Sequence, residues 1–202
     1  MLRGHRMKAL LKRMLDPEEF LSDYGVRSVS RYHLEHPYIY RAEGRSLSVD
    51  DEPSESRSRL FGGNSNWRGP IWFPMNFLII ESLHKFHHYY GDDFKIEYPT
   101  GSGTFVTIDQ VAAELTTRLV RIFLQNSEGA RQVNALYPRF QEDEYFRDYV
   151  PFYEYFDGDT GRGAGASHQT GWTGIIAKLL QPRRDYKLIE TVPEKQNRST
   201  TK

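Results

Sequence analysis

The sequence predicts an all-α fold, and three observations support that class. Apolar residues recur at helical spacing over residues 70–90 and again over 107–125. Each stretch begins with a helix start signal, a proline in the first and a capping sequence in the second. The alternation of apolar and polar side chains that marks a half-buried strand is weak throughout. We therefore expect helices joined by long, aromatic and Gly-rich loops.

The N-terminal region is expected to contain two helices. Residues 1–15 are basic, and their apolar side chains share one helical face, formed by Met7, Leu10, Leu11 and Met14. Residues 16–19 (DPEE) supply an N-cap, a proline at the first helical position and acids in the first turn. They predict a short second helix that ends before Gly25. Residues 26–61 show no clean period and read as irregular, and within them 46–58 form an acidic, serine-rich loop.

The strongest helix is predicted over residues 70–90, where Gly91 and Asp92 end it. The next begins at Thr107, because Gln110 stands where a capping box needs it, and it runs to about residue 125. Residues 126–150 have no convincing period, and a last short helix is expected over 172–180. We expect one domain, residues 1–181, followed by a polar and disordered tail over 182–202.

Composition and charge exclude several classes of function. The chain has 202 residues, and 27 basic residues balance 27 acidic ones, so the basic excess of a nucleic-acid-binding protein is missing. Cysteine is absent, which excludes disulfides, thiolate metal sites and cysteine nucleophiles. No apolar run approaches the length of about 18 residues that spans a membrane. We expect a soluble, cytoplasmic protein that binds neither nucleic acid nor membrane.

Aromatic residues make up 14% of the chain although hydrophobic residues reach only 38%. Rings can form the flat walls of a binding pocket, or they can fill a ring-rich core, and composition alone favours the core. Long loops inside a compact domain are uncommon unless they build a site.

The first candidate site is the string GGNSNWRGPIW over residues 62–72. Its glycines allow backbone to approach a ligand, and an indole face suits the apolar face of a sugar ring. The side chains of Arg68 and Asn66 suit hydroxyls or a carboxylate. The alternative is an ordinary helix start in which Trp72 packs into the core and Arg68 pairs with an acid. The length of the string favours a site.

The second candidate site follows residue 152, where Glu154 stands among four aromatic residues: Phe152, Tyr153, Tyr155 and Phe156. Surrounding rings exclude water and raise the pKa of a carboxyl toward the working pH of an acid or base. Taken alone, Glu154 would read as a surface acid on a turn. The glycines after it match neither a dinucleotide-binding fingerprint nor a phosphate-binding loop.

Two other chemistries have weaker support. His84, His87 and His88 lie on the predicted long helix at a spacing that could hold a metal, but H-E-x-x-H is absent and a solvated or packed histidine face is the better interpretation. No G-x-S-x-G sequence indicates a serine nucleophile. We expect neither a metal nor an organic cofactor.

Together the two strings resemble glycoside hydrolase family 63. The first resembles its W-R-G-P-[IV]-W…N signature, in the run 66–72 followed by Met75 and Asn76. The second resembles its closing E-x5-T-G-x-G…W-[TS] segment, in Glu154, Thr160, Gly161, Gly163, Gly171, Trp172 and Thr173. The resemblance covers about residues 16–181. It is strongest to the bacterial branch that includes mannosylglycerate hydrolase-like proteins and α-glucosidase relatives.

The resemblance implies an (α/α)6 toroid that hydrolyses an α-glucoside or α-mannoside bond with inversion. One carboxylic acid protonates the leaving oxygen, and a second carboxylate activates water on the opposite face of the sugar. Glu154 matches the general base. The expected partner is an oligosaccharide or a small glycoside. Its expected contacts are Trp67, Arg68, Gly69, Trp72, Tyr153, His168, Gln169 and Trp172.

One departure from the family pattern concerns the general acid. In the family it is an Asp well upstream of the W-R-G-P string, and the 66 residues before Trp67 contain no matching segment. A dozen helices with their loops also need roughly 300 residues or more. The sequence therefore predicts about the C-terminal half of such a domain, as a truncated gene product, a fragment or one part of a split protein whose N-terminal half is encoded separately. An inactive sugar-binding remnant and a helical interaction module remain as alternatives.

Overall fold

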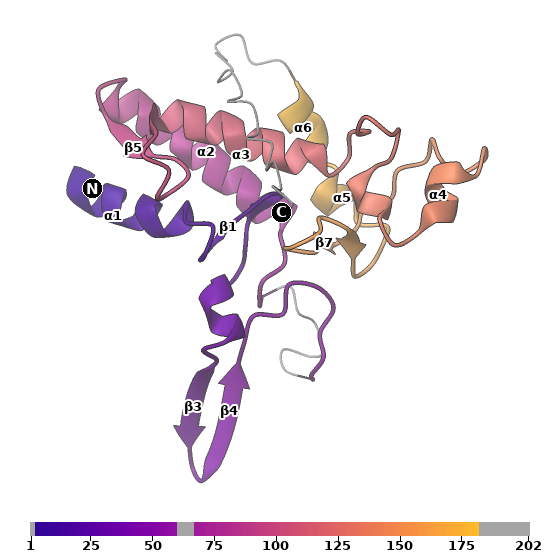
Figure 1. Ribbon diagram of the computed structural model, residues 1–202, viewed down its shortest axis with the longest axis horizontal. Helices are drawn as coiled ribbons and strands as arrows, with labels where there is room; N and C mark the ends of the chain where they lie inside the picture. The colour runs from indigo at the N-terminus through magenta and orange to yellow at the C-terminus, as the bar shows by residue number, and fades with distance from the viewer. Residues whose placement is uncertain (1–2, 60–66, 182–202) are drawn as a thin grey trace, which may run out of the picture.

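The computed structural model describes residues 3–59 and 67–181. Two long helices form its centre, α2 (Phe73–Tyr90) and α3 (Ile108–Arg121), and they lie side by side (Figure 1). The antiparallel hairpin of β5 (Lys95–Glu97) and β6 (Phe105–Thr107) connects them, so the two helices run in opposite directions. The N-terminal helix α1 (Gly4–Met14) packs against β5.

Short elements surround this helical pair. The hairpins are β1 (Leu21–Ser22) with β2 (Gly25–Val26), β3 (Tyr38–Ala42) with β4 (Arg45–Val49), and β7 (Tyr155–Phe156) with β8 (Gly163–Ala164). The short helices are α4 (Pro138–Glu142), α5 (Thr170–Thr173) and α6 (Ile176–Leu180), together with the 3-10 turns η1 (Arg31–Leu34) and η3 (Gln132–Asn134). Helix α6 packs on α3, and α5 packs on α2.

The all-α prediction is wrong. The structure is 37% helical and 17% strand, and the strands form four small antiparallel sheets. The residues that the structure describes contain one long helical pair, α2 with α3, instead of the half ring of paired helices that was predicted. Three of the four hairpins have strands of two or three residues, which is too short for a visible alternation of apolar and polar side chains.

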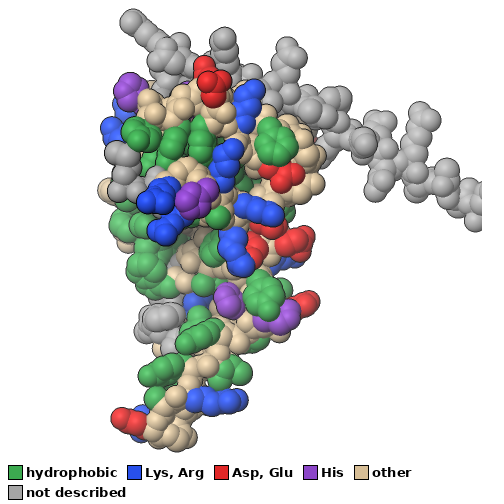
Figure 2. Space-filling model, turned by 90° about the vertical axis from the view of Figure 1, so that its left-hand side faces the viewer, with side chains coloured by type: hydrophobic (Ala, Val, Ile, Leu, Met, Phe, Trp, Pro, Cys, Tyr) green, Lys and Arg blue, Asp and Glu red, His purple; other side chains and the backbone are tan. Residues whose placement is uncertain are grey.

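The β3–β4 hairpin could not be predicted from the sequence for a different reason. Its side chains are exposed on both faces, so no buried face imposes alternation. Its turn is Glu43-Gly44, and both residues have positive φ values of 49° and 71°, as a tight two-residue hairpin turn requires. The hairpin projects away from the helices (Figure 1), and Figure 2 shows hydrophobic side chains along its narrow end. They include Tyr38, Ile39, Tyr40 and Leu47, each more than half exposed.

The predictions for the main helices are confirmed, and those for the short ones are not. Helices α1, α2 and α3 are all present, although α2 begins at Phe73 instead of residue 70 and α3 ends at Arg121 instead of about residue 125; Gly91 ends α2 with φ 74°. The expected helix after Pro17 is a series of turns that leads into β1. The expected helix over 172–180 is divided into α5 and α6. The predicted disordered tail lies outside the described residues.

The core lies where α1, α2 and α3 meet. Met7 and Leu11 of α1, Ile80 of α2, and Leu115 and Leu119 of α3 are all at most 2% exposed. Three rings extend this core toward the hairpin of β7 and β8 in edge-to-face contacts, with centroids 5.3–5.5 Å apart: Phe73, Phe123 and Phe156. None of the described helices is long and apolar enough to cross a membrane.

The start of α3 allows a direct test of the local signal that predicted it. Thr107 accepts a hydrogen bond from the amide of Gln110, and the side chain of Gln110 accepts one from the amide of Thr107. Thr107→Ala removes one of these bonds and should lower the free energy of unfolding by about 1 kcal/mol in urea denaturation. Thr117→Ala is the control, because Thr117 is exposed within the same helix and its hydroxyl donates only to the carbonyl of Ala113 one turn before it, so its loss should cost little. Equal effects of the two substitutions would contradict a capping role.

Candidate active site

A short antiparallel bridge joins the two strings that were singled out in the sequence. The amide of Ile71 donates to the carbonyl of Phe156 at 2.8 Å, and the amide of Phe156 donates to the carbonyl of Ile71 at 3.0 Å. Both side chains are fully buried. The W-R-G-P-I-W string and the segment after Glu154 therefore lie side by side although they are far apart in the sequence.

This bridge gathers the three tryptophans of the chain. The ring of Trp72 is 4.2 Å from that of Trp67 and 5.7 Å from that of Trp172, measured between centroids. Trp67 is 54% exposed and Trp172 37% exposed, whereas Trp72 is buried between them. The buried indole N–H of Trp72 has no hydrogen-bond partner. The three indoles form a surface that presents ring faces and holds one unused donor.

Glu154 lies next to this tryptophan surface and is half-buried. The indole N–H of Trp172 donates to the backbone carbonyl of Glu154 at 3.0 Å, and the amide of Glu154 donates to the carbonyl of Ala166 at 2.9 Å. A Cβ added at Gly165 would lie 2.9 Å from Oε2 of Glu154 and 2.6 Å from the ring of Tyr155. Glycine at position 165, with φ +70°, is therefore what allows the carboxylate to lie against the backbone there.

Three of the predicted sugar contacts, Tyr153, His168 and Gln169, lie on the segments next to Glu154. Tyr153 is 7% exposed, and burial raises the pKa of its hydroxyl. Thr173 donates its hydroxyl proton to the carbonyl of Tyr153, which fixes α5 against the strand. His168 and Gln169 are exposed, and the amide of Gln169 donates to the carbonyl of Phe152 at 2.7 Å. Both lie at the edge of the segment that carries Glu154.

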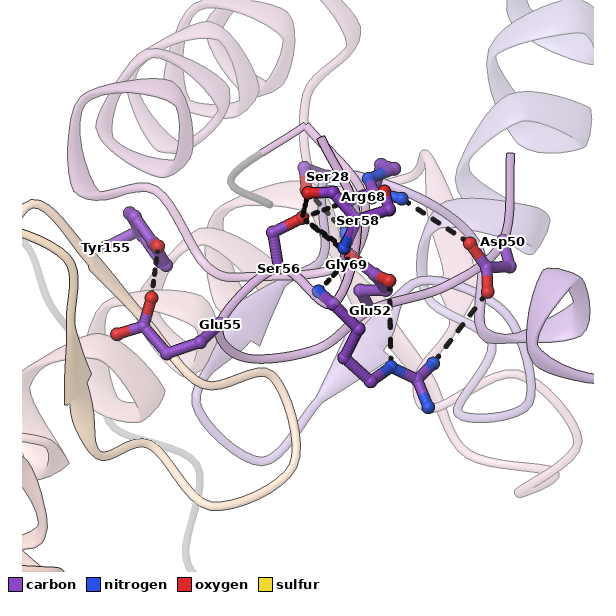
Figure 3. Close-up of polar contacts among 10 residues, drawn as sticks. Ser28, Asp50, Glu52, Glu55, Ser56, Ser58, Arg68, Gly69 and Tyr155 are labelled. Atoms are coloured by element: carbon purple, nitrogen blue, oxygen red, sulfur yellow. Dashed lines mark hydrogen bonds and ion pairs between the residues drawn. The ribbon is translucent and has the colours of Figure 1, made fainter. Parts of the chain in front are cut away.

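Arg68 lies elsewhere, inside a buried ionic cluster (Figure 3). Its side chain is 1% exposed and forms an ion pair with Glu52, which is 4% exposed. Its guanidinium also donates to Oγ of Ser56 at 2.6 Å and lies 3.5 Å from Asp50. The sugar contact predicted for Arg68 does not fit this position. The alternative weighed from the sequence, a guanidinium paired with an acid, describes it.

Gly69 likewise has a structural position. Its φ is +127°, and a Cβ there would collide with Oδ1 of Asp51. Its amide donates to Oγ of Ser28 at 2.8 Å. Glycine is required at this point because the acidic loop passes directly over its backbone.

Asp51 is 1% exposed, and its Oδ1 has no hydrogen-bond partner. The pKa of its carboxyl is raised to about 6, chiefly by burial, and the neighbouring Asp159 and Asp50 contribute in the same direction. Arg27 and Arg31 act in the opposite direction. The carboxyl therefore binds a proton more tightly in the folded chain than in the unfolded one.

Glu55 is a residue near the site that the sequence analysis missed. Its carboxylate accepts a hydrogen bond from the hydroxyl of Tyr155 at 2.9 Å (Figure 3) and one from the amide of Gly165 at 3.0 Å. Glu55 and Glu154 thus both approach Gly165. Nothing in the sequence distinguished Glu55 from the other acids of the exposed loop over 46–58, because its partners lie about a hundred residues away.

The three histidines of α2 do not form a metal site. Nδ1 of His84 lies 2.6 Å from Asp109 of α3, and Nε2 of His87 lies 3.4 Å from Asp92. Within residues 3–59 and 67–181, no group of three or more His, Asp or Glu side chains is arranged to hold a metal ion. The His84–Asp109 contact instead links the two central helices.

The buried ion pair of Arg68 predicts that Arg68 and Arg57, which both lie near the carboxylate of Glu52, differ greatly in their contribution to stability. Arg57 also lies near Glu52, at 3.6 Å, but it is 70% exposed. Arg68→Gln leaves Glu52 buried without its principal countercharge and should lower the free energy of unfolding by about 3–5 kcal/mol. Arg57→Gln should cost less than about 1 kcal/mol. Urea denaturation of both variants checks this, and similar costs would contradict a buried role for Arg68.

The raised pKa of Asp51 predicts a pH dependence of stability. Because the folded chain holds this proton more tightly, Asp51 favours folding below pH 4, and that contribution is lost as the pH rises toward 6. Asp51→Asn removes the effect. The free energy of unfolding of the variant, measured relative to that of the wild type, should therefore be about 2 kcal/mol higher above pH 6 than at pH 4. Urea denaturation between pH 4 and 7.5 measures the difference. A difference that stays constant with pH would show that Asp51 titrates normally.

Comparison with known proteins supports the family resemblance that these two strings suggested. Residues 1–173 match the domain described as the mannosylglycerate hydrolase MGH1-like glycoside hydrolase domain. An uncharacterized protein of Saccharomyces cerevisiae is 54% identical over 177 residues, which cover 87% of this chain and 16% of that protein. A mannosyl-oligosaccharide glucosidase of the same yeast is 29% identical over 87% of this chain and 15% of its own length.

A probable mannosyl-oligosaccharide glucosidase of Schizosaccharomyces pombe is 27% identical over 87% of this chain and 15% of its own length. The chain thus spans about one sixth of the length of these relatives. The predicted resemblance to glycoside hydrolase family 63 is confirmed by them. Because the matched region covers most of the chain and contains both signature strings, the chain belongs to the mannosylglycerate hydrolase MGH1-like glycoside hydrolase family.

Proposed function

We propose that this chain is the part of an inverting α-glycosidase that carries the general base, Glu154. The proposal rests on the hydrogen bond that the indole N–H of Trp172 donates to the backbone carbonyl of Glu154, which brings this residue next to the tryptophan surface. The names of the two mannosyl-oligosaccharide glucosidases support an oligosaccharide with an α-linked glucose as the substrate class.

The tryptophan surface has the chemistry of a sugar site. Exposed indole faces, as in Trp67 and Trp172, suit the apolar face of a pyranose ring. The unpartnered indole N–H of Trp72 is a donor that lacks an acceptor in the protein, and leaving such a group buried costs about 1–3 kcal/mol. Because this nitrogen is shielded from solvent, the exposed faces of Trp67 and Trp172 are the groups that we expect to contact a sugar.

The hydrolytic step needs two carboxyl groups with a water molecule between them. In our proposal Glu154 takes a proton from this water as its oxygen attacks the anomeric carbon. A carboxylic acid on the other side of the sugar protonates the leaving oxygen, so the glycosidic bond breaks as the bond to water forms. We propose that this acid is supplied by a separately encoded N-terminal half.

Glu55 and Gly165 support the position of the base in this scheme. The carboxylate of Glu55 holds the amide of Gly165, and Gly165 lies against the carboxylate of Glu154. Glu55 therefore acts as a positioning residue, because it fixes the backbone against which the base lies.

Glu154→Gln tests the role of the base. With the N-terminal half of the domain supplied in trans, hydrolysis of α-linked glucosides should fall by about 10²–10⁴-fold in kcat, because the amide cannot accept the proton from water. Binding of the same sugars should be retained. NMR of the wild-type reaction should show the β anomer of the released sugar first, as inversion requires.

Glu144→Gln is the matched control, because Glu144 is an exposed acid on the segment that precedes the site. It should leave kcat unchanged. If the chain binds sugars but Glu154→Gln changes no rate, the chain is a carbohydrate-binding module and the catalytic proposal is wrong. Unchanged sugar binding in Trp67→Ala and Trp172→Ala would favour an interaction module without a sugar role.

A further inference from the structure

A polar cavity lies among residues 125–148, apart from both signature strings and from the expected sugar contacts. We call it the arginine cavity, and its volume is about 350 Å³, which is at the lower end of the range for small-molecule sites. It lies in the region of α4, at the opposite end of the molecule from α1 (Figure 1). Its polar lining consists of two arginines, three amides and one acid: Arg131, Arg147, Gln125, Asn134, Gln141 and Asp148.

Hydrogen bonds hold one of the two arginines in place. Gln125 and Arg131 form a short antiparallel bridge, so the chain turns back on itself beside the cavity. The amide of Arg131 donates to Oε1 of Gln141 at 2.5 Å, and Nη1 of Arg131 donates to the carbonyl of Phe123 at 2.5 Å. These bonds fix Arg131 at the wall of the cavity, and they leave the side-chain NH2 of Gln141 free to donate.

The protein does not neutralise the positive charges of this cavity. Within residues 3–59 and 67–181, neither Arg131 nor Arg147 forms an ion pair, and Asp148 forms none either. Two guanidiniums and one carboxylate give the lining one net positive charge. Like charges at one small cavity repel each other, so an anion bound there would offset an unfavourable interaction.

Two buried polar atoms of the lining also lack partners in the described part of the chain. Asn134 is 1% exposed, and its Oδ1 accepts no hydrogen bond. The Nε of Arg131 is likewise buried and donates none. Such groups are rare in folded proteins, and two of them at one cavity distinguish it from an ordinary surface hollow. Both atoms are shielded from solvent, so a ligand first contacts the exposed guanidinium of Arg147.

This set of donors suits a phosphate group better than a carboxylate. A carboxylate has two oxygens, and one guanidinium can occupy both in a bidentate pair. A phosphate ester has three free oxygens and a charge of about −1.5 to −2 at pH 7. It can therefore accept from Arg131, Arg147 and the side-chain amide of Gln141 together. Asp148 can accept a hydrogen bond from a hydroxyl of the group that carries the phosphate.

We propose that the arginine cavity binds a phosphate group, either on a small phosphorylated polyol or as the free ion, with Arg131 and Arg147 as the cationic contacts. The proposal is independent of the proposed glycosidase activity, because neither Glu154 nor a residue of the tryptophan surface lines this cavity.

Isothermal titration calorimetry of the full chain at low ionic strength tests this proposal. The probes are inorganic phosphate, glycerol 3-phosphate and, as the neutral comparison, glycerol. Both phosphates should bind and glycerol should not. We expect glycerol 3-phosphate to bind more tightly than inorganic phosphate, because its hydroxyls can donate to Asp148. Added salt should weaken both interactions by screening the charges.

Substitutions of two exposed arginines separate a built site from general charge attraction. Arg147→Gln should weaken the binding of glycerol 3-phosphate by about tenfold or more, because a hydrogen bond between charged groups is lost. Arg139→Gln is the matched control, because Arg139 of α4 is exposed and does not line the cavity, so its loss should leave the affinity unchanged. Arg147→Lys keeps the charge without the planar fork and should bind with intermediate affinity. Thermal unfolding should show the same midpoint for all three variants.

The outcomes also identify the source of the phosphate group. Tighter binding of glycerol 3-phosphate supports a phosphorylated polyol, and equal or tighter binding of inorganic phosphate supports the free ion. If neither phosphate binds, if glycerol binds as tightly as its phosphate ester, or if Arg139→Gln and Arg147→Gln weaken binding equally, the cavity is not a phosphate site and the proposal is wrong.

Discussion

The arrangement of the site depends on the pair of backbone hydrogen bonds between Ile71 and Phe156. Their side chains point into the main core, and the flanking residues Trp72 and Tyr155 form a separate small cluster with Ala164. Because neighbouring residues in extended backbone face opposite ways, the bridge that buries Ile71 and Phe156 also fixes the rings on its other side. Glu154 lies two residues before Phe156, and the hydrogen bond from Trp172 to its carbonyl holds its backbone next to the tryptophans.

The acidic loop over residues 50–58 completes the site by tying both strings together. Its backbone binds the first string, since the amide of Glu52 donates to the carbonyl of Arg68. It binds the second as well, since Pro53 accepts from the amide of Gly158 at 2.7 Å and Glu55 holds Gly165. Buried ion pairs such as that of Arg68 often contribute little net stability, but they penalise any arrangement that separates the partners. The charge cluster therefore specifies one position for the loop.

The parts of the fold that the sequence predicted are those with local causes. The helix periods and the Thr107–Gln110 box act within a few residues, so α2 and α3 could be located without any tertiary information. The choice of Glu154 as the base came from the resemblance to the family, because the residue taken alone would read as a surface acid on a turn. The position of Arg68 and the contribution of Glu55 could not be predicted from the sequence, because long-range packing brings their partners to them. The short, exposed hairpins left no periodic signal.

The high aromatic content illustrates how one composition can serve two purposes. The expectation from composition alone was a ring-rich core, and Phe73, Phe123 and Phe156 form one with edge-to-face contacts. Other rings do not contribute to it, since Tyr149 and Trp67 are each more than half exposed. Leaving rings in water forgoes the burial energy of large apolar surfaces, about 25 cal/mol for each Å². Part of that loss falls beside Glu154, at the exposed rings of Trp67 and Trp172, and part falls elsewhere, as at Tyr38 and Tyr40 on the β3–β4 hairpin.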